Sequence, residues 1–291
     1  MLKDQINLDS KATRDFLTYA NAVIKSRAIA NVEDNLKPVH RRILHTMGEN
    51  KLWHNKKTVK SSNIVGKVMI YHPHGDTSIY DSIVRLSQPW KMRYPLIDMQ
   101  GNNGSILGDN AAASRYTEVR LTKFGELMLE GIEKKPVLFK PNYDETTEEP
   151  CYLPSVFPNV LCNGNAGIAV GLSSSLVPHN LKEVVNGINA YLDSKAITTE
   201  QLMRFIPGPD FPTGGTITNS DKIREIYETG NGTLTLRSKY SIEEVNSVNH
   251  IVIHEVPYQV NVETGVIEPI KKLVIEEGFD LIDDIENNTS K

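Results

Sequence analysis

The sequence HPHG at residues 72–75 sets the firmest constraint on the fold, because a proline and a glycine so close together interrupt a helix. On either side of it, apolar residues recur at helical spacing, over 62–71 and over 77–88. Ser61 and Asp76 precede these two stretches, and residues of these types commonly cap helices. The pattern predicts two helices joined by a tight turn, which is the layout of a helix-turn-helix.

In a helix-turn-helix, the second helix enters the major groove of DNA and the first crosses the backbone. The exposed face of the helix predicted over 77–88 carries Thr77, Asp81 and Arg85. A basic segment, HNKKTVK at 54–60, precedes the helix pair and favours DNA as the ligand. A helical hairpin with no DNA role is the alternative.

The rest of the chain mixes helical and β-like patterns. Helical spacing extends over 11–30, and a second helix is expected from Pro38, a residue that suits a first helical position. The segment 99–118 is rich in Gly, Asn and Ser and predicts a long functional loop. Beyond residue 150, short β-like runs alternate with turns and with a helical stretch over 181–192. We therefore expect an α+β fold.

The charges divide unevenly along the chain. Residues 1–125 hold 19 Lys and Arg against 11 Asp and Glu, whereas residues 126–291 hold 13 against 25. Such asymmetry between halves indicates that the basic half contacts nucleic acid. Solvated charge scattered by chance is the alternative explanation.

Composition narrows the class of protein further. With 39% hydrophobic and 23% charged residues, the chain is typical of a soluble globular protein. It has no apolar run of the roughly 18 residues that would span a bilayer, and its first residues lack the apolar centre of a secretory signal. Its two cysteines, Cys151 and Cys162, provide no disulfide framework and no metal-ligand spacing. We expect a cytoplasmic protein.

Five sequence blocks then point to a family. They are RAIANVEDNLKPVHRRIL, YHPHGDTSIYDSIVRLSQPW, GNNGSILGDNAAASRYTEVRL, NGNAGIAVGLSSSLVPHN and IPGPDFPTGG. In order and spacing, the chain resembles the A subunits of bacterial DNA gyrase and topoisomerase IV from about residue 15 to residue 270. A single short motif would be weak, but five ordered blocks are very specific. The blocks fit gyrase and topoisomerase IV alike.

The resemblance implies that Tyr116 attacks a DNA phosphodiester and becomes linked to the 5′ end of the broken strand. A phenol with a pKa of about 10 is a weak nucleophile at neutral pH, so it needs a base or a positive field. Arg115 matches the arginine that stabilises the pentacoordinate phosphate. His74 is a further catalytic candidate, for moving a proton from the tyrosine or to the leaving 3′ oxygen.

The same resemblance assigns DNA-backbone contacts to several basic residues, because cations there neutralise phosphates and fix the register of the duplex. The matching positions are Arg27, Lys37, His40, Arg42 and His72. The chain departs from the family at Glu33 and Asn35, where arginine and glycine are usual. An anion at position 33 predicts weaker phosphate attraction at that point.

The resemblance also implies a wedge and a drug site. Ile168 matches the isoleucine that enters between base pairs and bends the duplex, whereas a buried strand isoleucine is the plain alternative. Thr77 and Asp81 match the residues that hold quinolone drugs through a water–magnesium bridge. We therefore expect quinolone binding to the complex of the chain with cleaved DNA.

The spacing of His72, His74 and Asp76 also permits another interpretation, a metallo-hydrolase with histidine ligands. No further histidine follows nearby, so we expect no metal site in this chain. In the family, Mg²⁺ is bound by the B subunit, which also uses ATP. The glycine-rich segment 163–171 lacks the Gly-Lys-Ser/Thr ending of a nucleotide loop, so ATP binding here is not expected.

The family implies an architecture and an assembly. We expect a helical arm over 1–24, a winged-helix domain with the tyrosine over 25–145, and an incomplete α+β tower over 146–291. Two A subunits would form a homodimer on double-stranded DNA in the nucleoid, and their partner would be the B subunit. We also expect an exit gate and a C-terminal DNA-wrapping domain to be missing. A DNA-binding module that has lost catalysis remains the alternative.

Overall fold

The computed structural model describes residues 8–23, 29–169, 171–276 and 281–289. Throughout these ranges the strands pair antiparallel, and helices are interspersed among them. The chain is therefore α+β, as its sequence predicts. Within the same ranges, no helix combines the length and the apolar character needed to cross a bilayer.

Three helices form the centre of the first half: α2 (Pro38–Glu49), α3 (Ser61–Val68) and α4 (Asp76–Ser87). Each of them contacts the other two. Pro73 and Gly75 lie in the turn between α3 and α4, where neither residue has to fit inside a helix. The helix pair predicted around this break is confirmed, as is the helix that begins at Pro38.

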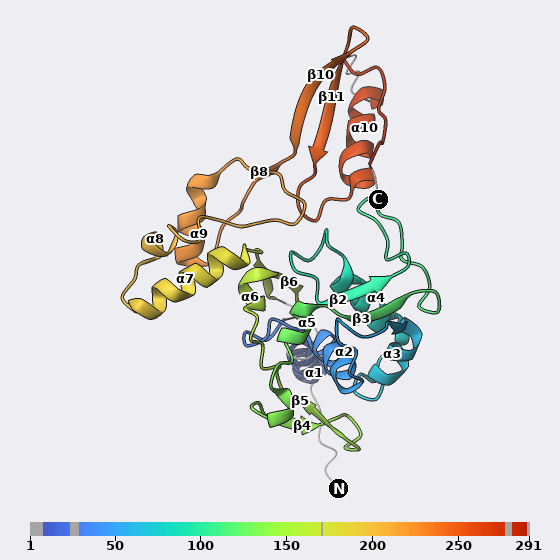
Figure 1. Cartoon of the computed structure of the whole chain (residues 1–291), viewed down its shortest axis with the longest axis vertical. Helices are drawn as coiled ribbons and strands as arrows, with labels where there is room; N and C mark the ends of the chain where they lie inside the picture. Colours follow the sequence, from blue (N-terminus) through green and yellow to red (C-terminus); the bar gives the residue numbers. More distant parts are fainter. Residues whose placement is uncertain (1–7, 24–28, 170, 277–280, 290–291) are drawn as a thin grey trace.

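A three-stranded sheet lies beside these helices (Figure 1). Its strands are β1 (Val59–Lys60), β2 (Ile97–Gln100) and β3 (Glu118–Leu121), with β3 in the middle. The prediction of one loop over 99–118 was wrong at both ends, because β2 includes Met99 and Gln100 and β3 begins at Glu118. Strands this short give little periodic signal of their own.

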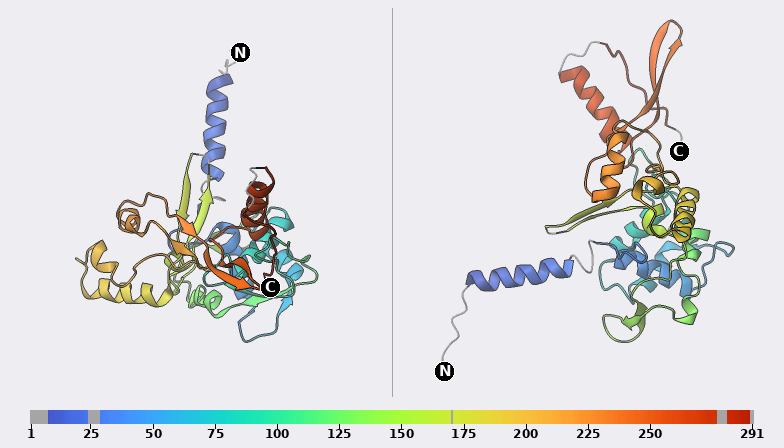
Figure 2. Two further views of the ribbon diagram at one scale, coloured as in Figure 1. Left: turned by 90° about the horizontal axis from the view of Figure 1, so that it is seen from above. Right: turned by 90° about the vertical axis from the view of Figure 1, so that its left-hand side faces the viewer.

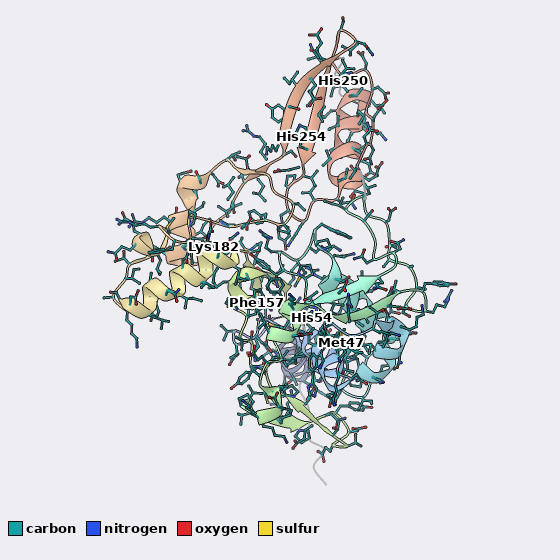
Figure 3. The ribbon with its side chains drawn as sticks, in the orientation of Figure 1. Met47, His54, Phe157, Lys182, His250 and His254 are labelled. Atoms are coloured by element: carbon teal, nitrogen blue, oxygen red, sulfur yellow. The ribbon has the colours of Figure 1, made fainter. Side chains whose placement is uncertain are left out.

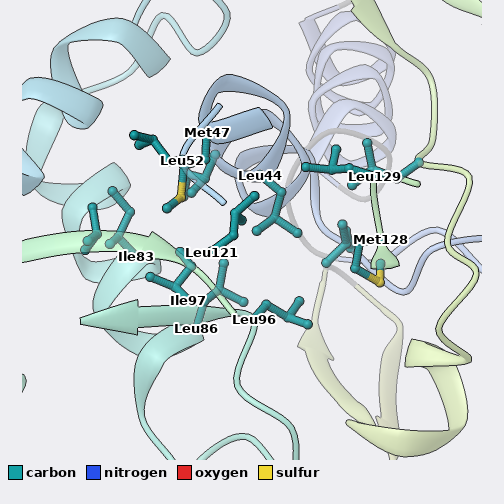
Figure 4. Packing of buried hydrophobic residues seen from close by; sticks show 14 of the residues in the cluster. Leu44, Met47, Leu52, Ile83, Leu86, Leu96, Ile97, Leu121, Met128 and Leu129 are labelled. Carbon is teal, nitrogen blue, oxygen red and sulfur yellow. The ribbon is translucent and has the colours of Figure 1, made fainter. Parts of the chain in front are cut away.

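One apolar core joins the helices to the sheet. Figure 4 shows Leu44 and Met47 of α2 close to Leu86, Leu96 and Leu121, and each of these five side chains is at most 2% exposed. Burying such a side chain contributes about 2–3 kcal/mol. The core therefore fixes α2, α4 and β3 as one rigid platform.

The helix starts differ in detail from the predicted caps. Gly75, not Asp76, occupies the N-cap position of α4, and Asp76 accepts a hydrogen bond from the amide of Thr77 instead. Ser61 is the first residue of α3 and makes no capping hydrogen bond. The helix expected over 11–30 is α1 (Leu8–Val23), and residues 29 and 30 are not helical.

Further helices and strands build the rest of the molecule (Figure 1). They are α5 (Lys123–Leu127), η2 (Ile132–Lys134), β4 (Phe139–Pro141), β5 (Glu148–Pro150), α6 (Asn159–Cys162), β6 (Asn165–Ile168), β7 (Ser173–Leu176), α7 (Leu181–Asp193), α8 (Thr199–Leu202), β8 (Thr216–Ile217), η3 (Ser220–Lys222), α9 (Ile223–Thr229), β9 (Leu236–Arg237), β10 (Lys239–Val245), β11 (Val248–Glu255), η4 (Glu263–Ile267) and α10 (Glu268–Glu276). Helix α7 confirms the helix predicted over 181–192, and each β-like run contains a strand. Strand β10, the partner of β11, is not predicted from the sequence.

Two elements project from the body on the same side, the helix α1 and the hairpin β6–β7 (Figure 2). Phe16, Leu17 and Tyr19 of α1 are exposed, whereas Ala20 is buried. The pattern that predicted the helix is therefore real, but most of its apolar face has no cover within the described residues. The β10–β11 hairpin and α10 extend the molecule along its longest axis (Figure 1).

A buried carboxylate ties the two halves of the chain together. Asp34 is 0% exposed and accepts hydrogen bonds from the amides of Leu36 at 3.0 Å and Leu153 at 2.9 Å. It also receives two from the guanidinium of Arg41, at 2.7 and 3.0 Å. A buried charge is tolerated only when it is paired and hydrogen-bonded, and Asp34 meets both conditions.

Asn35 explains one departure from the family. Its φ angle is +54°, in the left-handed region that glycine and asparagine enter at least cost. Its side-chain amide donates to the carbonyl oxygens of Gly164 at 2.7 Å and Asn159 at 3.3 Å. Asparagine therefore serves where glycine is usual and adds hydrogen bonds to the base of the β6–β7 hairpin. Glu33, the other departure, is exposed.

We predict that Asp34→Asn lowers the free energy of unfolding by about 3–5 kcal/mol, because it leaves the guanidinium of Arg41 buried without a counter-charge. Urea unfolding followed by circular dichroism measures this. The matched control is Glu33→Gln, one residue away but exposed, which should change stability by less than about 0.5 kcal/mol. Equal effects of the two substitutions would contradict the role given to Asp34.

Candidate functional site

Tyr116 lies in a turn that precedes β3. Before this turn comes the loop that follows β2, residues 101–113, which we call the glycine-rich loop. Its side chain is 63% exposed, so its hydroxyl is open to a ligand and not held in the core. Its backbone amide donates to the carbonyl of Ala113 at 2.8 Å, and the amide of Ser62 in α3 donates to the carbonyl of Ser114 at 3.2 Å. The turn is therefore fastened to α3 while the phenol faces outward.

Arg115 lies beside this tyrosine. Its guanidinium carbon is 4.6 Å from the centroid of the Tyr116 ring, and its side chain is exposed. A guanidinium can donate paired hydrogen bonds to a phosphate. The pair can thus present a nucleophile and an anion-binding group on one surface.

The pair His72 and His74 lies in the turn before α4. Their ring centroids are 4.6 Å apart in an edge-to-face arrangement, with His72 buried and His74 exposed. Within the described part of the chain, no hydrogen bond, ion pair or ring contact joins His74 to Tyr116 or Arg115. The three residues expected for catalysis are therefore divided: Arg115 lies with Tyr116, whereas His74 lies with His72, which is expected to contact DNA.

The geometry of His72 bears on the metallo-hydrolase hypothesis. The Nη1 atom of Arg42 lies 2.9 Å from Nδ1 of His72. A guanidinium only donates, so Nδ1 accepts, and in a neutral ring the proton is then on Nε2. Neither nitrogen offers a free lone pair to a metal. Among the described residues, no three His, Cys, Asp or Glu side chains gather as metal ligands.

Besides His72, Arg42 also binds Glu149. Its guanidinium binds the carboxylate of Glu149 in β5 through two hydrogen bonds, at 2.6 and 2.8 Å. Glu149 is only 4% exposed, so the pair is largely withdrawn from solvent. The charge of Arg42 is therefore compensated within the chain. Its contact with DNA stays a prediction, and the geometry favours a role in holding His72 and β5.

A group of cations lies where α2 begins and α4 ends. The Nζ atom of Lys37 donates to the carbonyl of Ala166 in β6 at 3.1 Å. Burial, followed by the charge of Arg85, lowers the pKa of Lys37, and the same two causes lower the pKa of Lys91. The charge of Arg85 therefore acts on both Lys37 and Lys91. Neighbouring cations of this kind attract anions. Lys91 is not among the basic residues expected from the sequence to bind DNA.

His40 lies within the same group. Its burial, together with the charges of Lys37, Arg85 and Arg41, lowers its pKa to about 3. In the chain alone this favours the neutral ring near pH 7, and the contact of His40 with DNA stays a prediction. Arg27, the remaining basic position expected to bind DNA, lies outside the described residues.

Ile168 is the last residue of β6, paired with Ser173 of β7. Its side chain is 88% exposed, which excludes the plain alternative of a buried strand isoleucine. A large apolar side chain at the end of a projecting hairpin has no packing role within the described chain (Figure 2). Lys37 and Asn35 both bind the base of this hairpin, so its direction is fixed.

Thr77 and Asp81 are both exposed in the first half of α4. They are one helical turn apart, so they lie on the same face of the helix. Within the described chain, Thr77 makes its side-chain hydrogen bond with its neighbour Asp76, and nothing covers this face. The surface is accessible to a small ligand, as the resemblance requires.

Residues 257–262 touch the site from the second half of the chain. The hydroxyl of Tyr258 donates to the carbonyl of Lys91 at 2.9 Å, and the amide of Val262 donates to the carbonyl of Ile106 at 3.4 Å. Gly108 has a φ of +106° and passes Asn261 so closely that a Cβ would clash with it. The sequence shows the glycines of the loop, but it gives no sign of their distant partner.

The structure thus brings Arg115 to Tyr116, and Lys37 to the β6–β7 hairpin that carries Ile168. The model of the family described as the A subunit of DNA gyrase/topoisomerase IV matches residues 27–291. The chain belongs to this family. The resemblance found in the sequence blocks is thereby confirmed.

Similar proteins support the same assignment. The DNA gyrase A subunit of Deinococcus deserti is 51% identical over 269 residues, which are 92% of this chain and 33% of that protein. The DNA gyrase A subunit of Leptospira biflexa is 49% identical over 282 residues, or 96% of this chain and 33% of that protein. The DNA gyrase A subunit of Pseudomonas aeruginosa is 44% identical over 290 residues, which are 98% of this chain and 31% of that protein. The chain thus spans about a third of the length of these relatives.

We predict that His40 makes the folded chain less stable as the pH falls. Its pKa is about 3 when folded, against an ordinary value of 6.5, so below pH 6.5 the unfolded chain binds a proton that the folded chain does not. The free energy of unfolding therefore falls between pH 6.5 and 5, with a slope from this residue of up to about 1.4 kcal/mol per pH unit.

The measurement is urea unfolding at several pH values in wild type and in His40→Gln, which should show a shallower slope. His250→Gln is the control, because His250 is exposed on β11, far from the core (Figure 3). If His40→Gln left the pH slope of the unfolding free energy unchanged, the lowered pKa given to His40 would be contradicted.

Proposed function

We propose that this chain is the DNA cleavage and religation part of a type II topoisomerase, with Tyr116 as its nucleophile. The exposure of Tyr116 beside Arg115, in a chain of the DNA gyrase/topoisomerase IV A-subunit family, is the observation that carries the proposal. The phenolic oxygen forms a bond to phosphorus at the 5′ side of the break, and the bond from phosphorus to the 3′ oxygen breaks. The product keeps the energy of the phosphodiester, so the reverse attack reseals the strand.

Each neighbouring residue has a role in this proposal. Arg115 donates hydrogen bonds to the phosphate as negative charge develops, a contact worth about 3 kcal/mol in comparable sites. The exposed ring of His74 accepts the phenolic proton or returns one to the 3′ oxygen. Because the two groups are not in contact in the chain alone, bound DNA would have to bridge them. His72 contacts the DNA backbone next to His74.

The surface for the duplex follows from the same elements. We propose a winged-helix domain over residues 25–145, in which α4 enters the major groove and β1–β3 form the wing. Lys37, Arg85 and Lys91 would neutralise phosphates there. An arm over 1–24 and a tower over 146–291 complete the proposed division.

Partners and ligands are proposed from the family. A second copy of the chain would supply the second tyrosine of a double-strand break. A B subunit would supply ATP hydrolysis and Mg²⁺. Quinolone drugs would bind at Thr77 and Asp81, on the open face of α4. We propose that the protein lies in the cytoplasm, associated with the nucleoid.

We predict that Tyr116→Phe abolishes formation of a covalent protein–DNA adduct, because phenylalanine has no oxygen to attack phosphorus. The chain is mixed with a B subunit of the family, Mg²⁺, DNA and a quinolone, and the protein-linked 5′ end is detected after denaturation. Tyr143→Phe is the control, since Tyr143 is 57% exposed in the turn between β4 and β5. An adduct that survives in Tyr116→Phe would refute the assignment, and a wild type that forms none would favour an inactive DNA-binding module.

We also predict that Ile168→Ala reduces DNA bending and cleavage without changing the stability of the fold. The wedge trades a few kcal/mol of base unstacking for a bent duplex that contacts more protein. Bending is measured by energy transfer between dyes at the ends of a short duplex. Ile242→Ala is the matched control, because Ile242 is 67% exposed on β10. Unchanged bending in Ile168→Ala would remove the wedge from the proposal.

A further inference from the structure

Three side-chain hydroxyls form a connected line beneath the turn of Tyr116. The Oγ1 atom of Thr117 lies 2.8 Å from Oγ of Ser61 and 3.0 Å from the hydroxyl of Tyr80. The hydroxyl of Tyr80 in turn donates to the carbonyl of Ala112. Ser61 and Thr117 are 0% exposed and Tyr80 is partly buried, so the Ser61–Thr117 end of the line is shielded from water.

The carbonyl at one end fixes the direction of every hydrogen bond in the line. A carbonyl oxygen only accepts, so the single hydroxyl hydrogen of Tyr80 is used on Ala112. Thr117 must then donate to Tyr80, and Ser61 must donate to Thr117. Each of the three hydroxyl hydrogens thus has one defined acceptor. In such a chain, each hydrogen bond polarises the next and strengthens it.

The line joins both flanks of Tyr116 to the rigid platform. Thr117 follows the tyrosine directly, and Ala112 comes four residues before it. Ser61 begins α3 and Tyr80 lies in α4, and both helices are packed into the core. The backbone amide of Ser61 also donates to the carbonyl of Thr117 at 3.0 Å. The tyrosine is therefore carried on a segment whose two sides are held by α3 and α4.

We propose that Ser61, Thr117 and Tyr80 are positioning residues for Tyr116, which hold its phenol in the place where it attacks the phosphate. This inference rests on the proposed cleavage function. The three hydroxyls lie below the turn and act through the backbone, so they set the rate of attack and not the affinity for DNA. In enzymes, a reacting group displaced by about 1 Å loses roughly 100-fold in rate.

The test compares Thr117→Val, which has nearly the same shape without the hydroxyl, with Thr117→Ser, which keeps the hydroxyl. Each is assembled with a B subunit, Mg²⁺ and a quinolone, and two quantities are measured: the Kd for a short duplex and the single-turnover rate of covalent adduct formation. We expect Thr117→Val to form the adduct roughly 10-fold to 100-fold more slowly with a Kd within about twofold of wild type. Thr117→Ser should restore the rate to within about threefold of wild type.

Tyr80→Phe provides a second route, in case Thr117→Val does not fold. It removes the contact with Ala112 and should slow the adduct in the same way, with melting checked by circular dichroism. Equal rates in wild type, Thr117→Val and Tyr80→Phe would overturn the inference while leaving the cleavage function intact. Parallel losses of DNA affinity and rate would also overturn it, since they indicate general damage. No adduct in wild type would instead refute the proposed function.

Discussion

The structure depends first on the carboxylate of Asp34. Taking a charge out of water costs several kcal/mol, and here two amides and one guanidinium offset the cost. Through Arg41 the carboxylate fixes the start of α2, and through Leu153 it fixes a segment more than a hundred residues later. Asn35, the next residue, then binds the base of the β6–β7 hairpin. The segment of this buried charge thus links the helical platform to the projecting β6–β7 hairpin.

A consequence of this arrangement is that two adjacent cations of α2, Arg41 and Arg42, are used inside the fold. Both are paired with buried carboxylates, and burial together with cationic neighbours lowers the pKa of His40 beside them. The count of 19 Lys and Arg in the first 125 positions therefore includes residues whose charge is compensated within the chain. A count of charges along a sequence does not separate these residues from exposed ones.

Local features could be predicted from the sequence, and distant pairings could not. The break at Pro73 and Gly75 predicted α3 and α4 because it acts on the neighbouring backbone alone. The sequence blocks correctly indicated the family. By contrast, the hydroxyl line depends on Ser61 meeting Thr117, which is 56 positions away in the chain, and a serine before an apolar run signals a cap equally well. The strand β2 was hidden because its pairing with β3, and not its own four residues, makes it a strand.

Residues 257–262 hold the glycine-rich loop at Ile106 and, by a separate hydrogen bond to the carbonyl of Lys91, the segment between α4 and β2. These same residues lie between the β10–β11 hairpin and η4, in the part that extends along the longest axis (Figure 1). The base of this extended part therefore lies against the loop that leads to Tyr116. Part of the framework that holds the segment of Tyr116 thus comes from residues much later in the chain.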